Sequence, residues 1–245
     1  MTTLILQIDI GHGTQWGDES APDIFRSICI PSVKNYAQRH GYDYELITES
    51  SYLSKIGPLN FLLTESKHYS FERYLRLKTH HENVVYIDND IYISDVAGPL
   101  PEICGLMAVA EPGKTNSQKL FSEVHNLPHD TTYYNSGLFM ADRHTADAIC
   151  DYMIYRATNN QKAKGKSTDN MMFNEFVHYE QSQFIELSEK WNYMPMLIGS
   201  SKGLRSNCLH LVGKHGKLFL SKLVSTGHPI KPLLENITIG NIVIE

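Results

Sequence analysis

Two aspartates separated by one residue, Asp88 and Asp90, directly follow an apolar run that ends at Ile87. The run is typical of a buried strand, and apolar residues resume immediately at Ile91. Carboxylates this close repel each other, and partly buried ones are costly unless a positive group lies between them. A divalent metal ion fits that position, because residues two apart on a strand share a face and can converge on one cation.

Other interpretations of the aspartate pair can be weighed against its neighbours. An EF-hand loop fails, because Ile93 and Pro99 occupy the positions that require Gly and Glu. A phosphatase of the haloacid-dehalogenase type carries its pair on the first strand and continues into Thr or Val, whereas Tyr92 stands at that position here. A solvated turn is the plain structural alternative. A nucleotide-sugar site uses both acids, because its cation bridges two donor phosphates and neutralises the departing diphosphate.

The segments that must position these acids alternate between strand-like and helix-like patterns. Such alternation predicts an α/β fold with a single mixed, mostly parallel central sheet flanked by helices. Functional side chains gather at the carboxyl ends of the strands in such a sheet. The expected strands are 4–10, 42–47, 84–87, 105–111, 136–142, 184–188 and 208–213, and the expected helices are 22–40, 61–80, 145–157 and 168–179.

Local signals refine the helix boundaries. Pro31 predicts a bend in the first helix and Gly41 predicts its end, because Gly readily adopts the left-handed conformation of a C-cap. Thr145 and Thr168 are expected as N-caps of two later helices. The polar, Lys-rich segment 158–167 is expected to be an exposed mobile loop that closes over the site as a lid.

The composition is that of an ordinary globular protein, with 42% hydrophobic and 20% charged residues among 245. A net charge of −5 and a pI near 6.2 argue against a broad basic surface for nucleic acid. No apolar run approaches the ~20 residues of a membrane span, so no transmembrane segment is expected. The four cysteines lie far apart without a CxxC pair, which favours free thiols and a cytoplasmic location.

Several further stretches accompany the aspartate pair in a fixed order. They are YLRLK (74–78), VVYIDND (84–90), NSGLFM (135–140), DNMMFN (169–174), KWN (190–192) and HLVGKHGK (210–217). Together they resemble the motifs of the GT-A glycosyltransferases, particularly the family-8-like retaining enzymes related to glycogenin and bacterial galactosyltransferases. The resemblance covers residues 1 to about 220 and implies a GT-A domain over 1–225. It leaves 226–245 as a C-terminal tail, either an added strand or the start of a linker.

This resemblance implies a transferase that moves a hexose from a nucleotide-sugar, expected to be a UDP-sugar, to a hydroxyl acceptor on a glycan. It implies that Asp88, Asp90 and His210 ligate Mn²⁺ or Mg²⁺ with two oxygens and one nitrogen. The residues implied in catalytic contacts with the sugars are Arg76, Asn135, Asp169 and Asn170. The residues implied in donor binding are Ile8, Asp9, Gly11, Arg76, Asp88, Asn89, Gly213, Lys214 and Lys217.

Departures from the family pattern leave part of this assignment open. The family's Lys often lies six residues after the His and precedes Pro-Trp, but Gly216 occupies that position here. Lys214 and Lys217 are therefore both candidates for the contact with the diphosphate. The segment between Arg76 and Asp88 is also short, so one wall of the site is expected to differ from the family's.

Two other functions are compatible with parts of the pattern. A nucleotidyltransferase would use paired aspartates and two metal ions on a similar sheet, but the Gly-rich turn 9–17 lacks Lys and Arg. A non-catalytic module would bind nucleotide-sugar or glycan without turnover. Retention of the anomeric configuration is expected from the resemblance, with Asp169 as the alternative candidate for the base that an inverting enzyme requires.

Overall fold

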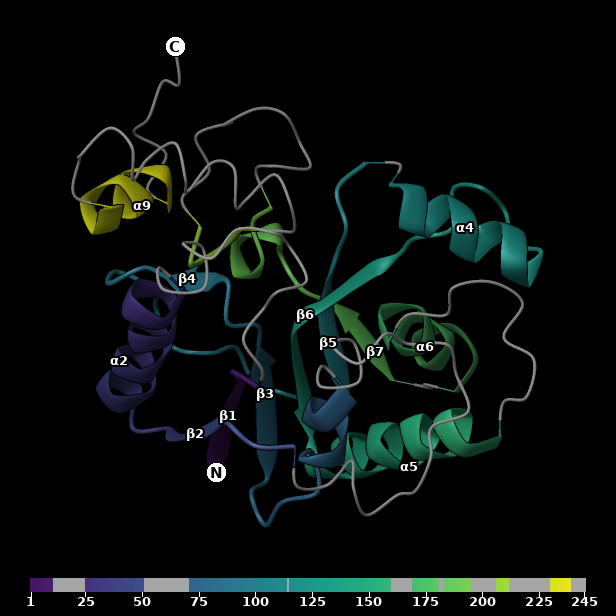
Figure 1. The fold of residues 1–245 in the computed structure, drawn as a ribbon, viewed down its shortest axis with the longest axis horizontal. Coiled ribbons are helices and arrows are strands. Elements are labelled where there is room, and N and C mark those ends of the chain that lie inside the picture. The colour runs from purple at the N-terminus through teal and green to yellow at the C-terminus, as the bar shows by residue number, and fades with distance from the viewer. Residues whose placement is uncertain are drawn as a thin grey trace.

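The structure, a computed structural model, describes residues 1–10, 25–50, 71–113, 115–159, 169–180, 183–194, 206–211 and 230–238. Its centre is a six-stranded sheet in the order β2-β1-β3-β6-β5-β7 (Figure 1). The strands are β1 (Thr3–Ile8), β2 (Asp43–Ile47), β3 (Asn83–Ile87), β5 (Leu106–Ala110), β6 (Tyr134–Asp142) and β7 (Phe184–Glu186). Of these six only β6 runs antiparallel to its neighbours, so the predicted mixed, mostly parallel sheet is confirmed.

The central strands present apolar side chains to both faces of the sheet. Leu4 and Leu6 of β1 belong to the hydrophobic cluster on one face, whereas Ile5 between them belongs to the cluster on the other. Tyr86 and Val85 of β3 divide in the same way. This period of two follows from the alternation of side chains along a strand. Each face is therefore a hydrophobic surface that helices must cover.

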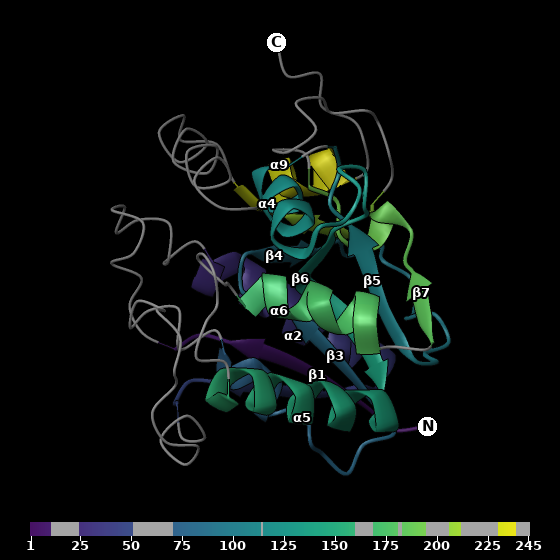
Figure 2. The same ribbon diagram turned by 90° about the vertical axis from the view of Figure 1, so that its right-hand side faces the viewer.

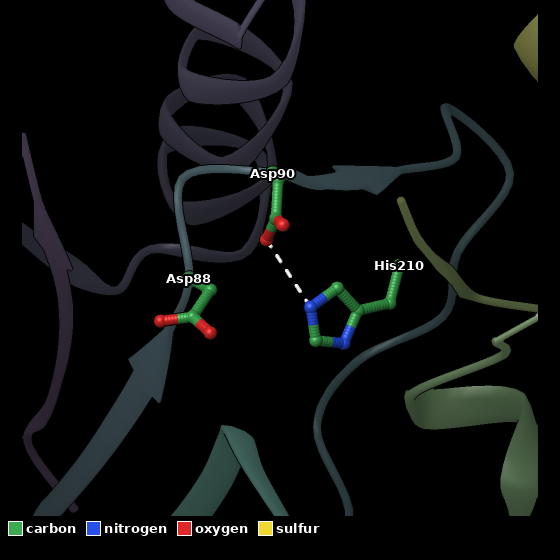
Figure 3. A group of neighbouring side chains, drawn as sticks. All are labelled: Asp88, Asp90 and His210. Carbon is green, nitrogen blue, oxygen red and sulfur yellow. Dashed lines mark ion pairs between the residues drawn. The ribbon is translucent and has the colours of Figure 1, made fainter. Parts of the chain in front are cut away.

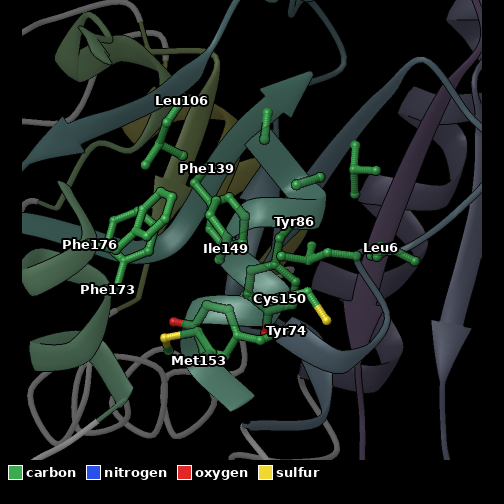
Figure 4. Close-up of a cluster of buried hydrophobic side chains, with 14 of the residues drawn as sticks. Leu6, Tyr74, Tyr86, Leu106, Phe139, Ile149, Cys150, Met153, Phe173 and Phe176 are labelled. Carbon is green, nitrogen blue, oxygen red and sulfur yellow. The ribbon is translucent and has the colours of Figure 1, made fainter. Parts of the chain in front are cut away.

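Helices cover the sheet from opposite sides (Figures 1 and 2). On one face, α5 (Arg143–Asn159) and α6 (Asp169–Glu175) pack against the cluster that contains Phe139 of β6 (Figure 4). On the other face, α2 (Ile30–His40) contributes Tyr36 to the second cluster. The sheet is thus the middle layer of three, as an α/β fold requires.

Shorter helical segments flank these layers. A π-helical turn over Phe25–Cys29 precedes α2, and another over Phe176–Glu180 continues α6. Helix α4 (Asn116–His125) begins after Thr115, whose side-chain oxygen accepts the Gln118 N–H at 3.1 Å as an N-cap. A single 3₁₀ turn, η5 (Glu189–Trp191), follows β7.

The helix boundaries agree with the sequence signals in part. Gly41 ends α2 with a φ of 72°, as predicted. Pro31 lies in the first turn of α2, directly after the π-helical turn, so the helix expected over 22–40 changes its geometry next to this proline. The predicted N-cap Thr145 is wrong: α5 starts earlier, and the Asp142 carboxylate accepts the Thr145 N–H at 2.8 Å. The other predicted N-cap, Thr168, lies outside the described residues.

The helix expected over 61–80 is described only from Phe71, and its helical residues end at Leu75. The last turn closes with the Arg76 N–H donating to the Glu72 carbonyl at 3.2 Å and the Leu77 N–H donating to the Tyr74 carbonyl at 3.3 Å.

A two-stranded ribbon lies beyond the carboxyl edge of the central sheet. It pairs β4 (Ile91–Ile93) with β8 (Cys208–His210) in antiparallel register. Helix α9 (Ile230–Thr238) packs against this ribbon (Figure 1). The described part of the C-terminal tail, 230–238, is this helix. Within the described ranges, no helix has the length and apolarity needed to cross a membrane.

Candidate active site

Asp88 and Asp90 lie on the short turn that leads from β3 into β4 (Figure 3). His210 ends β8 and pairs with Ile91 across the ribbon, so its imidazole reaches the same turn. One ligand atom from each of the three side chains lies within 4.8 Å of the other two. The His210 Nε2 is 3.1 Å from the Asp90 Oδ1. The fold thus brings together the three residues that the resemblance assigns to a metal ion.

The polar atoms of this group fit a divalent cation. The Asp90 Oδ1 is buried, and the His210 Nε2 lies beside it. The His210 Nδ1 donates to the Asn192 Oδ1 at 2.8 Å, which leaves Nε2 to face the carboxylates. The Asn192 amide is fixed in turn by the Asn135 Oδ1 at 3.0 Å. Two carboxylates and an imidazole suit Mn²⁺ or Mg²⁺ with positions left for further oxygen ligands.

Gly137 allows the metal group to form because it has no side chain. A Cβ at this position would lie 2.7 Å from the Asp88 Oδ2 and 2.8 Å from the Asn135 Oδ1, and would overlap the His210 ring. The Gly137 carbonyl also accepts the Asp88 N–H at 2.7 Å. The glycine of the NSG stretch is therefore needed for the close approach of β6 to the metal group.

We expect Gly137→Ala to weaken Mn²⁺ binding by about 10-fold or more, because the added methyl group pushes ligand side chains apart. Gly98→Ala is a matched control, since nothing lies within 4 Å of a Cβ built at Gly98. Electron paramagnetic resonance of Mn²⁺ measures both affinities. Equal affinity in the two variants would show that the site tolerates a side chain at position 137.

Arg73 connects the metal group to helix α6. Its guanidinium is 4% exposed and donates to the Asp88 Oδ1 at 3.1 Å. The same group contacts the Asp169 carboxylate and donates to the Ser136 Oγ at 2.9 Å. It lies 4.8 Å from the ring centroid of Tyr86, whose hydroxyl donates to the Asp88 Oδ1 at 2.6 Å. One buried cation thus holds two carboxylates from different parts of the chain.

Arg76, to which the resemblance assigns the donor contact, lies elsewhere. Its guanidinium is 3.3 Å from the Glu72 carboxylate and 3.5 Å from the Glu45 carboxylate. These two contacts place the guanidinium beside β2 and one turn back along its own helix. The arginine that reaches Asp88 is Arg73, which precedes the YLRLK stretch.

Asn135 and Asn170 meet at a carboxylate that sequence reasoning did not single out. The Glu111 Oε1 accepts from the Asn135 Nδ2 at 3.2 Å and from the Asn170 Nδ2 at 3.5 Å. The Asn170 Oδ1 accepts the Ser136 N–H at 2.9 Å. Asn135 lies near the start of β6, and because β6 is antiparallel this start lies at the carboxyl edge of its neighbours.

A pocket of about 330 Å³ opens beside this network. Its walls come from the end of β5, from β7 and from the segment around η5. Glu111 and Asn192 line it, so the pocket adjoins the residues that hold His210 and Asn135. Its other lining residues are Val109, Ala110, Pro112, Glu186, Leu187, Ser188, Glu189, Tyr193 and Met194.

The charges of the site shift each other's pKa. Burial raises the pKa of Asp88 to about 6, against the effect of Arg73 and with added repulsion from Asp90. Burial lowers the pKa of His210, but the neighbouring carboxylates, Asp90 first, outweigh it and leave the pKa raised. Burial also raises the pKa of Glu111. The group therefore holds protons more tightly than free side chains would, as expected where a cation belongs.

Raising the pH is therefore expected to destabilise the metal-free protein. The stabilisation linked to Asp88 is fully present below its unfolded pKa of ~4 and is lost as the pH rises through about 6. Melting temperatures of metal-free wild type and Asp88→Asn, measured from about pH 4.5 to 7.5, separate the contribution of Asp88 to stability from that of the other titrating groups. The wild type should lose more stability than the variant over this range, and parallel curves would contradict the assignment.

The structure describes some of the remaining residues that were predicted to bind the donor, and not others. Ile8 is buried at the end of β1, and the Asp9 carboxylate accepts from the Arg26 Nε at 2.7 Å. Asn89 lies in the turn between the two aspartates. The predictions that fall outside the described residues are Gly11, Gly213, Lys214, Lys217 and the lid loop from residue 160 onward.

Comparison with known proteins supports the fold assignment. No family model matches the chain, and no curated protein matches its sequence. Solved structures do match. The galactosyltransferase LgtC, in complex with donor and acceptor sugar analogs, has a TM-score of 0.58 at 12% identity, covering 91% of this chain and 95% of LgtC.

Two further solved structures agree. A glycosyltransferase involved in the glycosylation of the major capsid of PBCV-1 has a TM-score of 0.57 at 12% identity, covering 91% of this chain and 100% of its own. Mouse xyloside xylosyltransferase 1 has a TM-score of 0.51 at 11% identity, with 86% and 97% covered. The chain therefore has the GT-A fold of these glycosyltransferases, as the sequence resemblance implied.

Proposed function

We propose that this chain is a metal-dependent glycosyltransferase that moves a hexose from a nucleotide-sugar, a UDP-sugar, to a hydroxyl of a glycan. The observation that carries the proposal is the convergence of Asp88, Asp90 and His210 at the carboxyl edge of a GT-A sheet. Ligands bind at this edge in open α/β sheets. The similarity of the chain to solved glycosyltransferases supports the same assignment.

Asp88, Asp90 and His210 would hold Mn²⁺ or Mg²⁺, which neutralises the charge that grows on the leaving diphosphate. Arg73 fixes the carboxylates of Asp88 and Asp169, so that they keep their positions while the donor binds. We assign Arg73, rather than Arg76, to the arginine role in this site.

The sugar-binding role falls to the amide groups beside the pocket. Asn135 and Asn170 are both held by Glu111, which fixes the direction of their remaining hydrogen-bonding groups. Asp169 is engaged by Arg73, whereas Glu111 borders the pocket. Retention is proposed from the resemblance. In an inverting reaction Glu111 would be better placed than Asp169 to act as the base.

We assign the pocket of about 330 Å³ to the acceptor. Glu111, Glu186 and Glu189 line it, and the lining residues that the structure describes include no Lys or Arg. An acceptor that carries a carboxylate or sulfate would therefore meet like charges, whereas neutral or cationic glycans would not.

A neutral oligosaccharide is accordingly expected to show a lower KM than its carboxylated counterpart. The double substitution Glu186→Gln and Glu189→Gln should narrow the ratio of the two KM values, because it removes two negative charges and keeps the shape of the wall. Steady-state rates with the paired acceptors measure this ratio. An unchanged ratio in the variant would place the acceptor elsewhere.

The experiment that tests the proposed function is a screen of nucleotide-sugars with and without Mn²⁺ by thermal shift. A donor present at 100 times its Kd stabilises the native state by ~2.7 kcal/mol, which a melting curve detects readily. Stabilisation that requires both UDP-sugar and Mn²⁺ supports the proposal. A nucleotidyltransferase would instead respond to nucleoside triphosphate and release pyrophosphate. A non-catalytic module would bind the donor without ever releasing its diphosphate.

A further inference from the structure

The metal group is divided between two separate sheets. Asp88 follows β3 of the central sheet, whereas Asp90 and His210 adjoin β4 and β8 of the ribbon. Hydrogen bonds of the central sheet therefore do not fix the relative position of all three ligands. A two-stranded ribbon is marginally stable by itself, so its position depends on what packs against it.

The ribbon is packed from both sides. Ile91, Ile93 and Cys208 join the cluster that includes α2 and one face of the central sheet. Tyr92 and Leu209, which pair across the ribbon, join a different cluster with residues of α9. The residues that α9 contributes are Leu234 and Ile237, with Ile230 packed at the margin. Helix α9 is thus the outer support of the strands that carry two metal ligands.

The carboxylate of Glu235 connects α9 to β4 by hydrogen bonds. The Glu235 side chain accepts hydrogen bonds from the Tyr92 hydroxyl, from the Ser94 Oγ at 2.8 Å and from the Asp95 N–H at 2.8 Å. These donors lie on β4 and directly after it, only a few residues from Asp90. A carboxylate that accepts several such bonds is held strongly, because bonds to a charged acceptor exceed neutral ones.

We propose that Glu235 is a positioning residue for the metal site and that α9 sets the ribbon in the place where Asp90 and His210 meet Asp88. The inference rests on the proposed function, because it takes the three residues as metal ligands. Its consequence is that α9, which contributes none of these three ligands, controls the affinity for the cation.

Glu235→Gln in the full chain tests this role with Mn²⁺ alone as the probe. The amide keeps the size of the side chain but loses the charge and turns one acceptor oxygen into a donor group. We expect the Kd for Mn²⁺, measured by electron paramagnetic resonance, to rise by about 10-fold or more, as for other residues that orient metal ligands. The circular dichroism spectrum should stay that of the wild type, because the central sheet does not depend on Glu235.

Asp95→Asn is the control for charge. It removes one negative charge from the same region and breaks the 2.9 Å pair with Lys231, but it keeps the Asp95 N–H that Glu235 accepts. Its Kd for Mn²⁺ should stay within about 2-fold of the wild type, since exposed ion pairs contribute little. If Glu235→Gln does not fold, Ser94→Ala removes one hydrogen bond to Glu235 and should raise the Kd by a smaller factor.

Two outcomes would overturn the inference. The first is a lower melting temperature of Glu235→Gln with wild-type affinity for Mn²⁺, which would mean that Glu235 only stabilises the fold. The second is an equal loss of affinity in Asp95→Asn, which would mean that charge alone matters. A wild-type chain that binds no Mn²⁺ would instead contradict the proposed metal site itself.

Discussion

Replacing His210 with alanine (His210→Ala) is expected to lower turnover of a nucleotide-sugar by about 100-fold or more while the chain stays folded. His210 supplies the nitrogen ligand, and Asn192 holds its ring with Nε2 toward the carboxylates. Without it, two repelling carboxylates are left to bind the cation, so the affinity for Mn²⁺ should fall together with turnover. Steady-state rates and a Mn²⁺ titration of the same preparation measure both effects.

His81→Ala is the matched control. His81 is also a buried histidine held by a polar partner, with its Nε2 2.9 Å from the Asp43 carboxylate, but it lies before β3 rather than after it. Its loss should lower the melting temperature and leave Mn²⁺ binding unchanged. If His210→Ala behaves in the same way, His210 is a structural core residue and does not ligate the metal.

Substitution of Arg73 is expected to have the second largest effect. Arg73→Ala leaves the carboxylates of Asp88 and Asp169 without their shared cation, and breaking a buried pair typically costs about 3–5 kcal/mol of stability. Arg73→Lys keeps the charge, but an ammonium group cannot reproduce the planar contacts to both carboxylates and Ser136. We expect Arg73→Lys to fold and to lose roughly 10-fold to 100-fold in kcat/KM, the equivalent of hydrogen bonds to a charged group.

Arg76→Ala provides the comparison within the same segment. Arg76 pairs with the exposed Glu45 carboxylate and with Glu72, whose side chain is fully buried, so Arg76→Ala leaves a buried carboxylate without this partner and costs stability. The melting temperature of Arg76→Ala should therefore fall, whereas kcat/KM of the folded variant should stay close to wild type. A large loss of kcat/KM in Arg76→Ala with little change in Arg73→Lys would restore the role that the sequence resemblance implies for Arg76.

The fold could be predicted because its signals are local. The near-continuous apolar runs of β1 and β3 indicate strands buried on both faces, and Gly41 marks a helix end through its left-handed conformation. The end of the helix at Leu75 and the N-cap Asp142 were not predicted. The N-cap depends on the hydrogen bond that the Asp142 carboxylate accepts from the Thr145 N–H, and Thr145 was an equally good N-cap candidate by residue type.

The metal ligands of the site could be predicted from the sequence, but the residues that position them could not. Asp88, Asp90 and His210 belong to types and motifs that indicate metal binding, and the structure brings them together. Arg73 was missed because its sequence neighbours do not distinguish it from Arg76. Only the folded chain shows that the Arg73 guanidinium reaches Asp88 and Asp169. Glu111 had a usable signal, since it directly follows an apolar strand as Asp88 does.

The positioning residues that lie far from the aspartate pair in the sequence follow no motif that would predict their role. Glu235 lies in the tail, and its partners Tyr92 and Ser94 follow the aspartate pair. Only the register of β4 with β8 and the packing of α9 bring these residues together. Contacts of this type arise from tertiary packing, which a pattern of residue types along the chain does not encode.

The release of UDP from a UDP-hexose by the purified chain tests the central claim most directly. The wild type with Mn²⁺ should release UDP, and EDTA or the substitution Asp90→Asn should reduce the rate by about 100-fold or more, because both remove the cation from the leaving diphosphate. Asp90→Asn should keep the fold, as judged by its melting curve. A rate in EDTA equal to that in Mn²⁺, or an unchanged rate in folded Asp90→Asn, would contradict a metal-dependent transferase at this site.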